Sequence, residues 1–261
     1  MDMITSIHNE SIVETRKLKQ KKHREASGLF LAEGLRLCEV AAAVDAVEQA
    51  YYHEALADTD RGAALLRELS GRTRRFVKVS ARVMQAMAET EAPQGILCVC
   101  KCRQVSLKDF QPDKEGLVLL ADGIQDPGNL GAMLRILWAG EGRGLICLRG
   151  TTDPFGGKCV RASMGGIFHV PVINGVDWPG VARWAIVNGY EVIAAESGAG
   201  RDYRRINWPK KTLLCIGNEA QGLITIPAAE VKERVYIPVK EGAESLNAAV
   251  AAGILVFEAN R

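Results

Sequence analysis

The sequence lacks the glycine patterns by which most nucleotide-dependent enzymes hold phosphate. A P-loop requires GxxxxGK[ST], which does not occur in the 261 residues. A dinucleotide-binding fold requires GxGxxG between its first strand and the next helix. The nearest approach, GEGRG at 140–144, follows a predicted helix and precedes a predicted strand, so a helix terminus and turn explain it better. These absences argue against a nucleotide-dependent enzyme of the doubly wound type.

Residues typical of hydrolytic and metal-dependent catalysis are also scarce. The chain has only four histidines, and no Ser-His-Asp arrangement stands out. Its seven cysteines are odd in number. Cys98, Cys100 and Cys102 alternate and would share one face of a strand, but no paired CxxC or histidine cluster accompanies them. We therefore expect no metal, and we interpret the cysteines as buried thiols in a reducing compartment.

Long apolar runs are missing as well. No run reaches the length of a membrane span, and the N-terminal MDMITSIHNE is too polar for a secretory signal. The hydrophobic fraction of 48% and the charged fraction of 25% are ordinary for a globular protein. We therefore expect a cytoplasmic protein without a membrane partner, long enough for one large domain or two ordinary ones.

Charge is balanced overall but unevenly distributed. The net charge of +2 says little about partners. Residues 16–24, RKLKQKKHR, contain six Lys or Arg and no acid, and RTRRFVK follows at 72–78. Such runs can follow a phosphate backbone. A solvated helix face or a frayed terminus explains the first run equally well when it is taken alone.

Strand-like and helix-like segments alternate along the chain, which indicates an α/β fold. We predict a smaller N-terminal α/β domain over 1–104, a polar linker over 105–116 and a second domain over 117–261. In the first domain, strands are expected at 28–34, 46–52, 76–80 and 95–102, and helices at 33–44, 60–69 and 81–89.

Continuous apolar runs in the second domain predict a mostly parallel sheet with helices on both faces. Its strands are expected at 117–121, 145–148, 168–172, 191–195, 213–217 and 235–239. Its helices are expected at 130–139, 158–166, 179–188 and 245–259. Ser245 is well placed to cap the last of these helices.

Three segments are more specific than a scaffold requires, and the first is DPGNLGAMLR at 126–135. Asp-Pro-Gly makes a turn, and Asn129 can cap a helix beginning at Leu130. Arg135 is the only charge in the apolar stretch that follows. Because a buried guanidinium is costly unless it is paired, Arg135 either forms a structural ion pair or faces a cleft that receives an anion. The local pattern does not choose between these explanations.

The other two segments each join a strand to a glycine-rich or polar loop. In LLCIGNEAQGL, at 213–223, a buried strand runs into Gly217, and Gly222 closes the loop. An ordinary strand-to-helix loop also explains this segment, with Glu219 solvated or at a helix start. In open α/β sheets, ligands bind beyond the carboxyl ends of strands, and glycine there lets a ligand approach the backbone. In 235–259 a strand, a polar loop and Ser-Leu-Asn precede a helix of small residues, which a capped core helix also explains.

Taken together, the three segments resemble the motifs of the SpoU/TrmH-type branch of the SPOUT RNA methyltransferases. The first motif is matched by Asn129, Gly131 and Arg135, the second by Gly217, Glu219 and Gly222, and the third by Ile237, Pro238, Ser245, Leu246 and Asn247. The stretch DPFGGKCVRASMGGIFHVPV between them carries Lys158, Arg161 and Ser163. Ala220 stands where many members have glycine, with little consequence expected. FLAEGLRLCEVA resembles, more weakly, the substrate-binding domain often fused ahead of this family.

The resemblance implies a C-terminal domain with a deep trefoil knot, a homodimer with composite active sites, and S-adenosylmethionine as cofactor. It implies methyl transfer to a ribose 2′-hydroxyl in structured RNA, with ribosomal RNA favoured over transfer RNA. The implied cofactor-binding residues are Gly217, Asn218, Gly222, Ile237 and Leu246. A non-catalytic RNA-binding or ribosome-assembly protein on the same fold is the alternative.

By the same resemblance, Arg135 is the central catalytic residue. A guanidinium stays protonated, with a pKa above about 12, so we expect Arg135 to hold the target phosphate or 2′-oxygen rather than act as a free base. Asn129, Glu219, Ser245 and Asn247 are expected to orient Arg135 and the ribose. The implied RNA-binding residues are Lys17, Lys19, Lys21, Lys22, Arg24, Arg74, Lys158 and Arg161.

Overall fold

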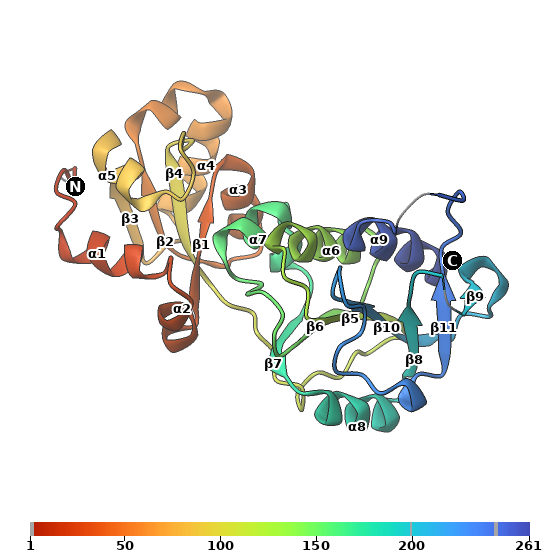
Figure 1. Cartoon of the computed structure of the whole chain (residues 1–261). Helices are drawn as coiled ribbons and strands as arrows, with labels where there is room; N and C mark the ends of the chain where they lie inside the picture. Colours follow the sequence, from red (N-terminus) through yellow and green to blue (C-terminus); the bar gives the residue numbers. More distant parts are fainter. Residues whose placement is uncertain (1–2, 199, 243–244) are drawn as a thin grey trace. The chain divides into compact units, whose positions relative to one another are not determined.

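The computed structural model describes residues 3–198, 200–242 and 245–261, which form two compact units (Figure 1). The first unit comprises Met1–Cys102 together with Phe155–Phe168, and the second comprises Arg103–Pro154 and His169–Arg261. The segment 155–168, which the sequence places in the second domain, joins the first unit through aromatic packing. Phe30 lies with its ring centroid 5.4 Å from that of Phe155 and 5.6 Å from that of Phe168.

The first unit is built on a mixed four-stranded sheet in the order β1-β4-β2-β3. β4 is antiparallel to both of its neighbours, whereas β2 and β3 are parallel. The strands are β1 (Leu29–Glu33), β2 (Val47–Tyr52), β3 (Arg75–Lys78) and β4 (Ile96–Lys101). The helices are α1 (Glu10–Lys17), α2 (Lys21–Ser27), α3 (Leu35–Ala43), α4 (Asp60–Ser70), α5 (Ala81–Met87) and α7 (Gly157–Ala162), with 3₁₀ turns η1 (Glu54–Asp58) and η2 (Gly166–Phe168).

The second unit is built on an all-parallel seven-stranded sheet in the order β7-β6-β5-β10-β8-β11-β9. Helix α8 covers one face, while α6 and α9 cover the other (Figure 1). The strands are β5 (Gly116–Asp122), β6 (Gly144–Leu148), β7 (Val172–Val176), β8 (Glu191–Ala195), β9 (Arg201–Asp202), β10 (Lys211–Gly217) and β11 (Glu233–Tyr236). The helices are α6 (Pro127–Ala139), α8 (Trp178–Asn188) and α9 (Ala248–Ala259), with 3₁₀ turns η3 (Tyr203–Arg205) and η4 (Ala228–Glu230).

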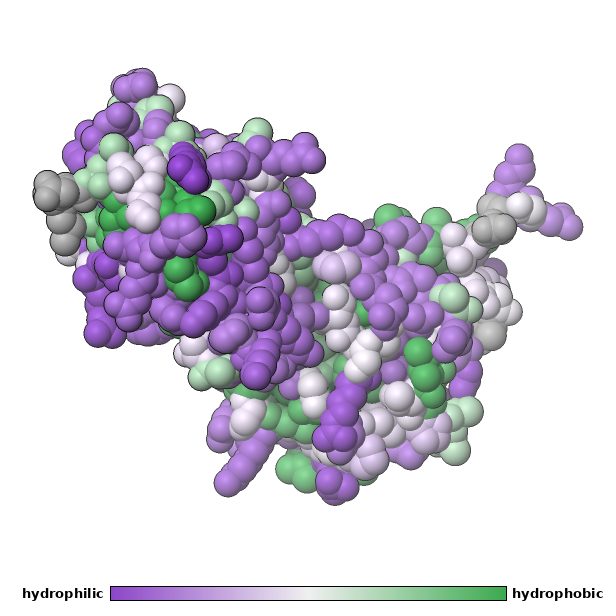
Figure 2. All heavy atoms as spheres, turned by 60° about the vertical axis from the view of Figure 1, so that its left-hand side comes forward, coloured by the Kyte–Doolittle hydropathy of each residue, from purple (hydrophilic) through white to green (hydrophobic). Residues whose placement is uncertain are grey.

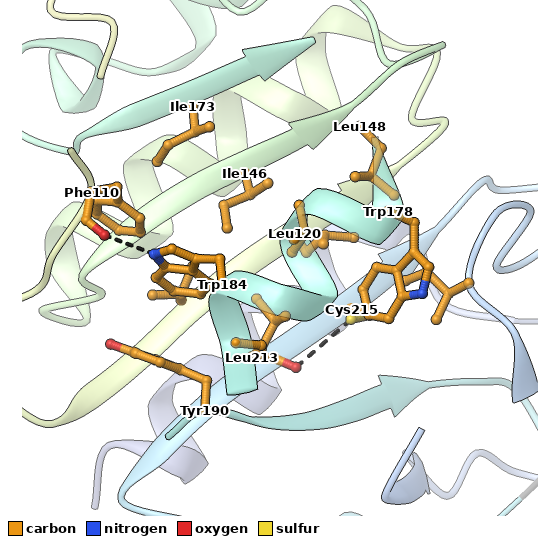
Figure 3. Packing of buried hydrophobic residues seen from close by; sticks show 14 residues of the cluster. Phe110, Leu120, Ile146, Leu148, Ile173, Trp178, Trp184, Tyr190, Leu213 and Cys215 are labelled. Carbon is orange, nitrogen blue, oxygen red and sulfur yellow. Dashed lines mark hydrogen bonds between the residues drawn. The ribbon is translucent and has the colours of Figure 1, made fainter. Parts of the chain in front are cut away.

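The core beneath α8 also holds the segment that the sequence marks as a linker. Trp184 of α8 stacks on Phe110 at a centroid distance of 5.3 Å (Figure 3). The indole Nε1 of Trp184 donates a hydrogen bond to the carbonyl of Phe110 at 2.7 Å. Phe110 is buried among residues of the sheet, including Ile146 and Leu213. Val105 and Leu107 pack against the same core, and the Val105 N–H donates to the carbonyl of Val172 at 3.0 Å, so residues 105–116 are part of the second unit.

Two helix caps differ from the predicted ones. α6 begins at Pro127, and Asp126 rather than Asn129 caps it; the Asp126 carboxylate accepts from the Asn129 N–H at 3.1 Å. Proline suits the first helical position because the N–H that it lacks would have no intrahelical partner there. α9 is capped by Asn247 rather than Ser245, through the N–H groups of Ala249 and Val250 at 2.9 and 3.2 Å.

One predicted strand is also displaced. The segment 168–172 was expected to be extended, but β7 begins only at Val172 and Phe168 ends a 3₁₀ turn. The reason is that Phe168 packs against Phe30 in the first unit instead of entering the parallel sheet. Across the residues that the structure describes, no helix is long and apolar enough to span a membrane.

Candidate active site

A cavity of about 960 Å³ opens at the carboxyl ends of β8, β10 and β11. This is the edge of a parallel sheet at which ligands bind in open α/β folds. The walls come from the segments that follow these three strands and from the first turns of α9. The volume lies within the range of about 300–1,000 Å³ that is usual for small-molecule sites.

The structure brings the predicted cofactor residues together around this one cavity. Gly217, Asn218, Gly222, Ile237 and Leu246 all line it. Three of the predicted catalytic residues, Glu219, Ser245 and Asn247, line it as well.

The loop after β10 closes tightly over the backbone, and this closure explains its glycines. Asn218 and Gly222 exchange both of their backbone hydrogen bonds, at 2.8 and 2.9 Å. Gly222 has a φ of +70°, which few residues other than glycine adopt readily. A Cβ on Gly217 would lie 2.2 Å from the carbonyl carbon of Gly222. Only glycine therefore fits at 217, whereas Ala220, exposed and without a positive φ, fits its place.

Side-chain hydrogen bonds fix the same loop to the turn after β5. The Asn218 Nδ2 group donates to the carbonyl of Gly123 at 2.9 Å, and its Oδ1 accepts from the N–H groups of Ala220 and Gln221. Asn218 thus holds the shape of the cavity wall that it also lines.

Asp122 is a residue of this region that the sequence reasoning missed. It ends β5 and is fully buried. Its carboxylate accepts hydrogen bonds from the N–H groups of Ile224 and Thr225 at 2.6 and 2.8 Å, and from the Thr225 hydroxyl at 2.8 Å. A buried charge is costly unless its oxygens are satisfied, so Asp122 holds the far end of the β10 loop in place. The available signal was an acid at the end of the buried run LVLLAD.

A chain of hydrogen bonds joins the three motifs at the edge of the cavity. Asn247 donates through Nδ2 to Oδ1 of Asn129 at 2.9 Å, and Asn129 donates through Nδ2 to Oε1 of Glu219 at 2.8 Å. The partners are 118 and 90 positions apart in sequence. Because Asp126 caps α6, the Asn129 side chain is available to link the other two motifs, and the hydrogen bonds fix the orientation of Asn247, Asn129 and Glu219 relative to one another.

Arg135 lies apart from this chain. Its side chain is exposed rather than buried, and it makes no hydrogen bond or ion pair with any residue that the structure describes. It follows Asn129 by six helical residues, about 9 Å along the axis of α6. The structural ion pair considered from the sequence is thus not formed within the described residues, and the guanidinium faces outward.

Arg135 shares its helix flank with exposed apolar side chains. Trp138, one turn further along α6, is 40% exposed, and Val250 and Phe257 of α9 are 51% and 53% exposed. α6 and α9 pack directly on each other, with a Cβ position on Gly253 lying 3.5 Å from Ile136. The two helices therefore present large apolar side chains to solvent beside the cavity.

In the first unit, two of the predicted RNA-binding side chains donate hydrogen bonds to backbone carbonyls. The Lys19 ammonium donates to the carbonyls of Ala86 and Ala88 at 3.2 and 2.6 Å, and burial lowers its pKa. Arg24 is only 7% exposed, and its guanidinium donates to the carbonyls of Leu18 and Lys19, both at 2.8 Å. These contacts leave Arg24 little access to a ligand.

The other predicted cations differ in how they are paired. Lys17 lies 2.6 Å from Glu14, Lys21 lies 3.7 Å from Glu25, and Arg74 lies 3.8 Å from Glu48. Lys22 is exposed and has no partner among the described residues. Figure 2 shows the first unit turned forward, with a surface that is mostly hydrophilic but interrupted by apolar side chains.

Of the two predicted cations on α7, Arg161 holds the segment 155–168 within the first unit. Its guanidinium lies 3.0 Å from Glu89 and 4.0 Å from Glu33. Glu33 is buried and also accepts from the Glu89 N–H at 2.7 Å. Lys158 is exposed on the same helix. Ser163 is fully buried and donates to the carbonyl of Val160 at 2.7 Å, a structural contact.

The all-parallel sheet, the glycine-closed cavity at its carboxyl edge and the three-motif hydrogen-bond chain define a cofactor-binding α/β enzyme. Residues 116–257, more than half of the chain, match the SpoU rRNA Methylase family, and the chain belongs to that family. Residues 9–98 match the MRM3-like substrate binding domain.

Similar proteins match over the full length. The chain is 32% identical to the 23S rRNA (guanosine(2553)-2′-O)-methyltransferase RlmP of Bacillus subtilis, covering 98% of each chain. An AdoMet-bound rRNA methyltransferase from Sinorhizobium meliloti superposes with a TM-score of 0.87 at 32% identity, covering 99% of this chain and 97% of the other. The SpoU methyltransferase AviRb from Streptomyces viridochromogenes, in complex with AdoMet, superposes at 0.86 with 26% identity, covering 97% of each.

Proposed function

We propose that this protein is an S-adenosylmethionine-dependent RNA 2′-O-ribose methyltransferase that acts on ribosomal RNA. The observation that carries the proposal is the convergence of all five predicted cofactor residues on one cavity in a chain of the SpoU family. The full-length similarity to a 23S rRNA 2′-O-methyltransferase favours ribosomal over transfer RNA.

The cavity suits S-adenosylmethionine in both shape and chemistry. A Cβ at Gly217 would fill the space where the loop backbone closes, so this wall offers backbone groups rather than a side chain. Adenine carries donors and acceptors on its edge, which backbone at Gly217, Ile237 and Leu246 would match within apolar surroundings. The bound cofactor supplies an activated methyl group on a sulfonium.

In this mechanism the protein aligns the ribose and assists loss of its 2′-hydroxyl proton. Arg135 remains protonated, so we assign it the binding of the target phosphate or 2′-oxygen and the stabilisation of negative charge developing there. Asn129, Glu219 and Asn247 hold one another by hydrogen bonds at the cavity edge and present their remaining polar atoms to the ribose. Ser245, an exposed residue, lines the same cavity as Glu219 and Asn247.

We further propose a homodimer in which the flank formed by α6 and α9 is the contact surface. Exposed Trp138, Val250 and Phe257 support this, because large apolar side chains gathered beside a site indicate association. A dimer would also explain why Arg135 takes no part in the hydrogen-bond chain of its own subunit, since it would complete the site of the partner.

Three further parts of the proposal rest on family membership. We infer a trefoil knot in 117–261, supported by β10 lying between β5 and β8, both of which precede it in sequence. We infer that 1–104 binds the RNA substrate, supported by the match to a substrate binding domain. A cytoplasmic location, with neither membrane nor metal, is consistent with ribosomal RNA as the substrate.

The decisive test substitutes Arg135. Arg135→Ala is expected to lower 2′-O-methylation of ribosomal RNA by at least about a hundredfold while leaving S-adenosylmethionine binding unchanged. Arg183→Ala, an exposed arginine on α8 across the sheet, is the matched control. Turnover near that of the wild type would refute the role of Arg135. A wild-type chain that binds RNA but no S-adenosylmethionine would instead identify a non-catalytic RNA-binding or ribosome-assembly protein.

A further inference from the structure

The first unit contains a groove of about 600 Å³ on the side of its sheet next to α1 and α2. It lies entirely within this unit and is distinct from the cofactor cavity. Its floor is apolar where Leu18 and Val99 are buried and Leu29 is partly exposed. Its size is within the range of small-molecule sites, and the planar face of a nucleobase packs favourably on such a floor.

A buried relay of hydrogen bonds fixes one polar side chain at the groove. The Thr15 hydroxyl donates to the Tyr51 hydroxyl at 3.0 Å, which donates to Oε1 of Gln49 at 2.9 Å. Tyr51 is fully buried and Thr15 is 5% exposed. The relay satisfies the carbonyl side of the Gln49 amide, so its Nε2 hydrogens are the donors left to a ligand. Such a network fixes the orientation of the residue at its end.

An arginine, a histidine and two carboxylates surround this oriented amide. Arg75 is directly opposite Gln49 in the sheet register, and its side chain is exposed. Neither Arg75 nor His23 has a side-chain partner within the described part of the chain. Glu10 and Glu14 of α1 lie on the groove wall, and Glu14 is paired with Lys17. A surface that only follows the RNA backbone would not place carboxylates here, whereas a pocket for one base and its phosphate would use both charges.

We propose that this groove binds a single unpaired RNA nucleotide whose base carries an exocyclic amino group. In this arrangement the base lies on the Leu18–Val99 floor, Gln49 donates to an acceptor on the base edge, and Glu10 accepts from the amino group. Arg75 binds the phosphate. Sequence-selective proteins read RNA mainly through unstacked bases hydrogen-bonded at their edges. The inference deepens the proposed function and rests on it for the choice of RNA as the ligand.

The test measures binding of fluorescent RNA hexamers, C₆, A₆ and U₆, to the full-length chain by anisotropy. S-adenosylhomocysteine is added in excess so that the cofactor cavity does not bind adenosine. We expect U₆, which has no exocyclic amino group, to bind most weakly. Gln49→Met and Arg75→Gln should each weaken binding of the preferred hexamer by about fivefold or more.

Arg67→Gln on α4 is the matched control, since it removes an exposed arginine of the same unit that does not line the groove. It should leave hexamer affinity unchanged. Arg75→Gln alters only an exposed side chain, so it keeps the test decisive if Gln49→Met does not fold. Equal affinity for all three hexamers, or wild-type affinity in Arg75→Gln, would overturn the proposal.

The outcomes also separate this inference from the proposed function. If the chain binds and uses S-adenosylmethionine but the groove variants bind the hexamers as tightly as the wild type, the proposed function stands and the proposed nucleotide site in the groove is refuted. If the chain binds no S-adenosylmethionine but shows the expected order of hexamer affinities, the proposed function is refuted and the proposed nucleotide site stands.

Discussion

The cofactor cavity of the second unit and the groove of the first unit use polar side chains differently. Around the cavity, the side chains of Asp122, Asn218 and Asn247 form hydrogen bonds mainly with backbone groups, so the loops are fixed before a ligand binds. In the first unit, Lys19 and Arg24 support helix ends, while Arg75 stays uncommitted. A motif and a basic run are therefore not equal evidence for a binding site, because a side chain that already bonds its own backbone has fewer polar groups left for a ligand.

The largest effect should come from the cavity wall. In Gly217→Ala the new methyl group would overlap the Gly222 backbone, which cannot move without breaking its two hydrogen bonds to Asn218. We expect S-adenosylmethionine affinity to fall by about 3 kcal/mol, or roughly a hundredfold, measured by calorimetry. Ala220→Gly in the same loop is the control and should bind normally. Wild-type affinity in Gly217→Ala would show that the wall is not rigid.

A smaller effect is expected where a buried carboxylate holds the loop from behind. Asp122→Asn keeps the size of the side chain but removes the negative charge that strengthens the hydrogen bonds from the Ile224 and Thr225 N–H groups to Oδ2. It also sets an amide NH₂ group opposite the Thr225 hydroxyl, which donates to Oδ1 of Asp122. We expect the KM for S-adenosylmethionine to rise about tenfold, near 1.5 kcal/mol, while the KM for RNA stays constant.

Thr225→Val serves as the graded control for Asp122, because it removes only the hydroxyl donor to that carboxylate. It should raise the KM for the cofactor less than Asp122→Asn does. Equal changes in both KM values, or a fall in kcat alone, would contradict a role confined to positioning the cofactor loop.

The sequence predicted a residue's position and role well when these depend on nearby residues, and poorly when they depend on contacts distant in the chain. The parallel sheet followed from continuous apolar runs, whereas the motif residues followed from their resemblance to the SpoU/TrmH-type family. Asp122 did not, because its partners lie about a hundred positions away. The composition of RKLKQKKHR did not show that Arg24 is buried, since only tertiary contacts decide which cation meets a carbonyl. For Arg135 the local pattern left an ion pair and an anion-receiving cleft open, because it did not show that Leu134 and Leu137 face the core while Arg135 is exposed.

The difference between lysines that bond backbone carbonyls and lysines that have no partner among the described residues can be tested within the basic run at 16–24. Lys19→Met removes donors to two carbonyls and should lower the free energy of unfolding by about 1 kcal/mol, seen in urea titrations. Lys22→Met, on an exposed and unpaired lysine, should leave stability unchanged and reduce the salt slope of RNA binding by about 1. The reverse assignment of effects would mean that the carbonyl contacts of Lys19 do not matter for folding.

The smallest effect is expected at the flank of α6, where His169 stacks on Trp138 with centroids 4.2 Å apart. Partial burial and then the positive charge of Arg103 lower the imidazole pKa below its usual 6.5. The unfolded chain therefore binds a proton at His169 more readily than the folded chain does. The part of the free energy of unfolding that depends on neutral His169 is fully present above pH 6.5, and it is lost as the pH falls through the lower pKa of the folded chain. An NMR titration should place His169 below 6.5, and Arg103→Gln should raise it. A His169 that titrates at or above 6.5 would show that stacking on Trp138 leaves the ring as well solvated as a free histidine.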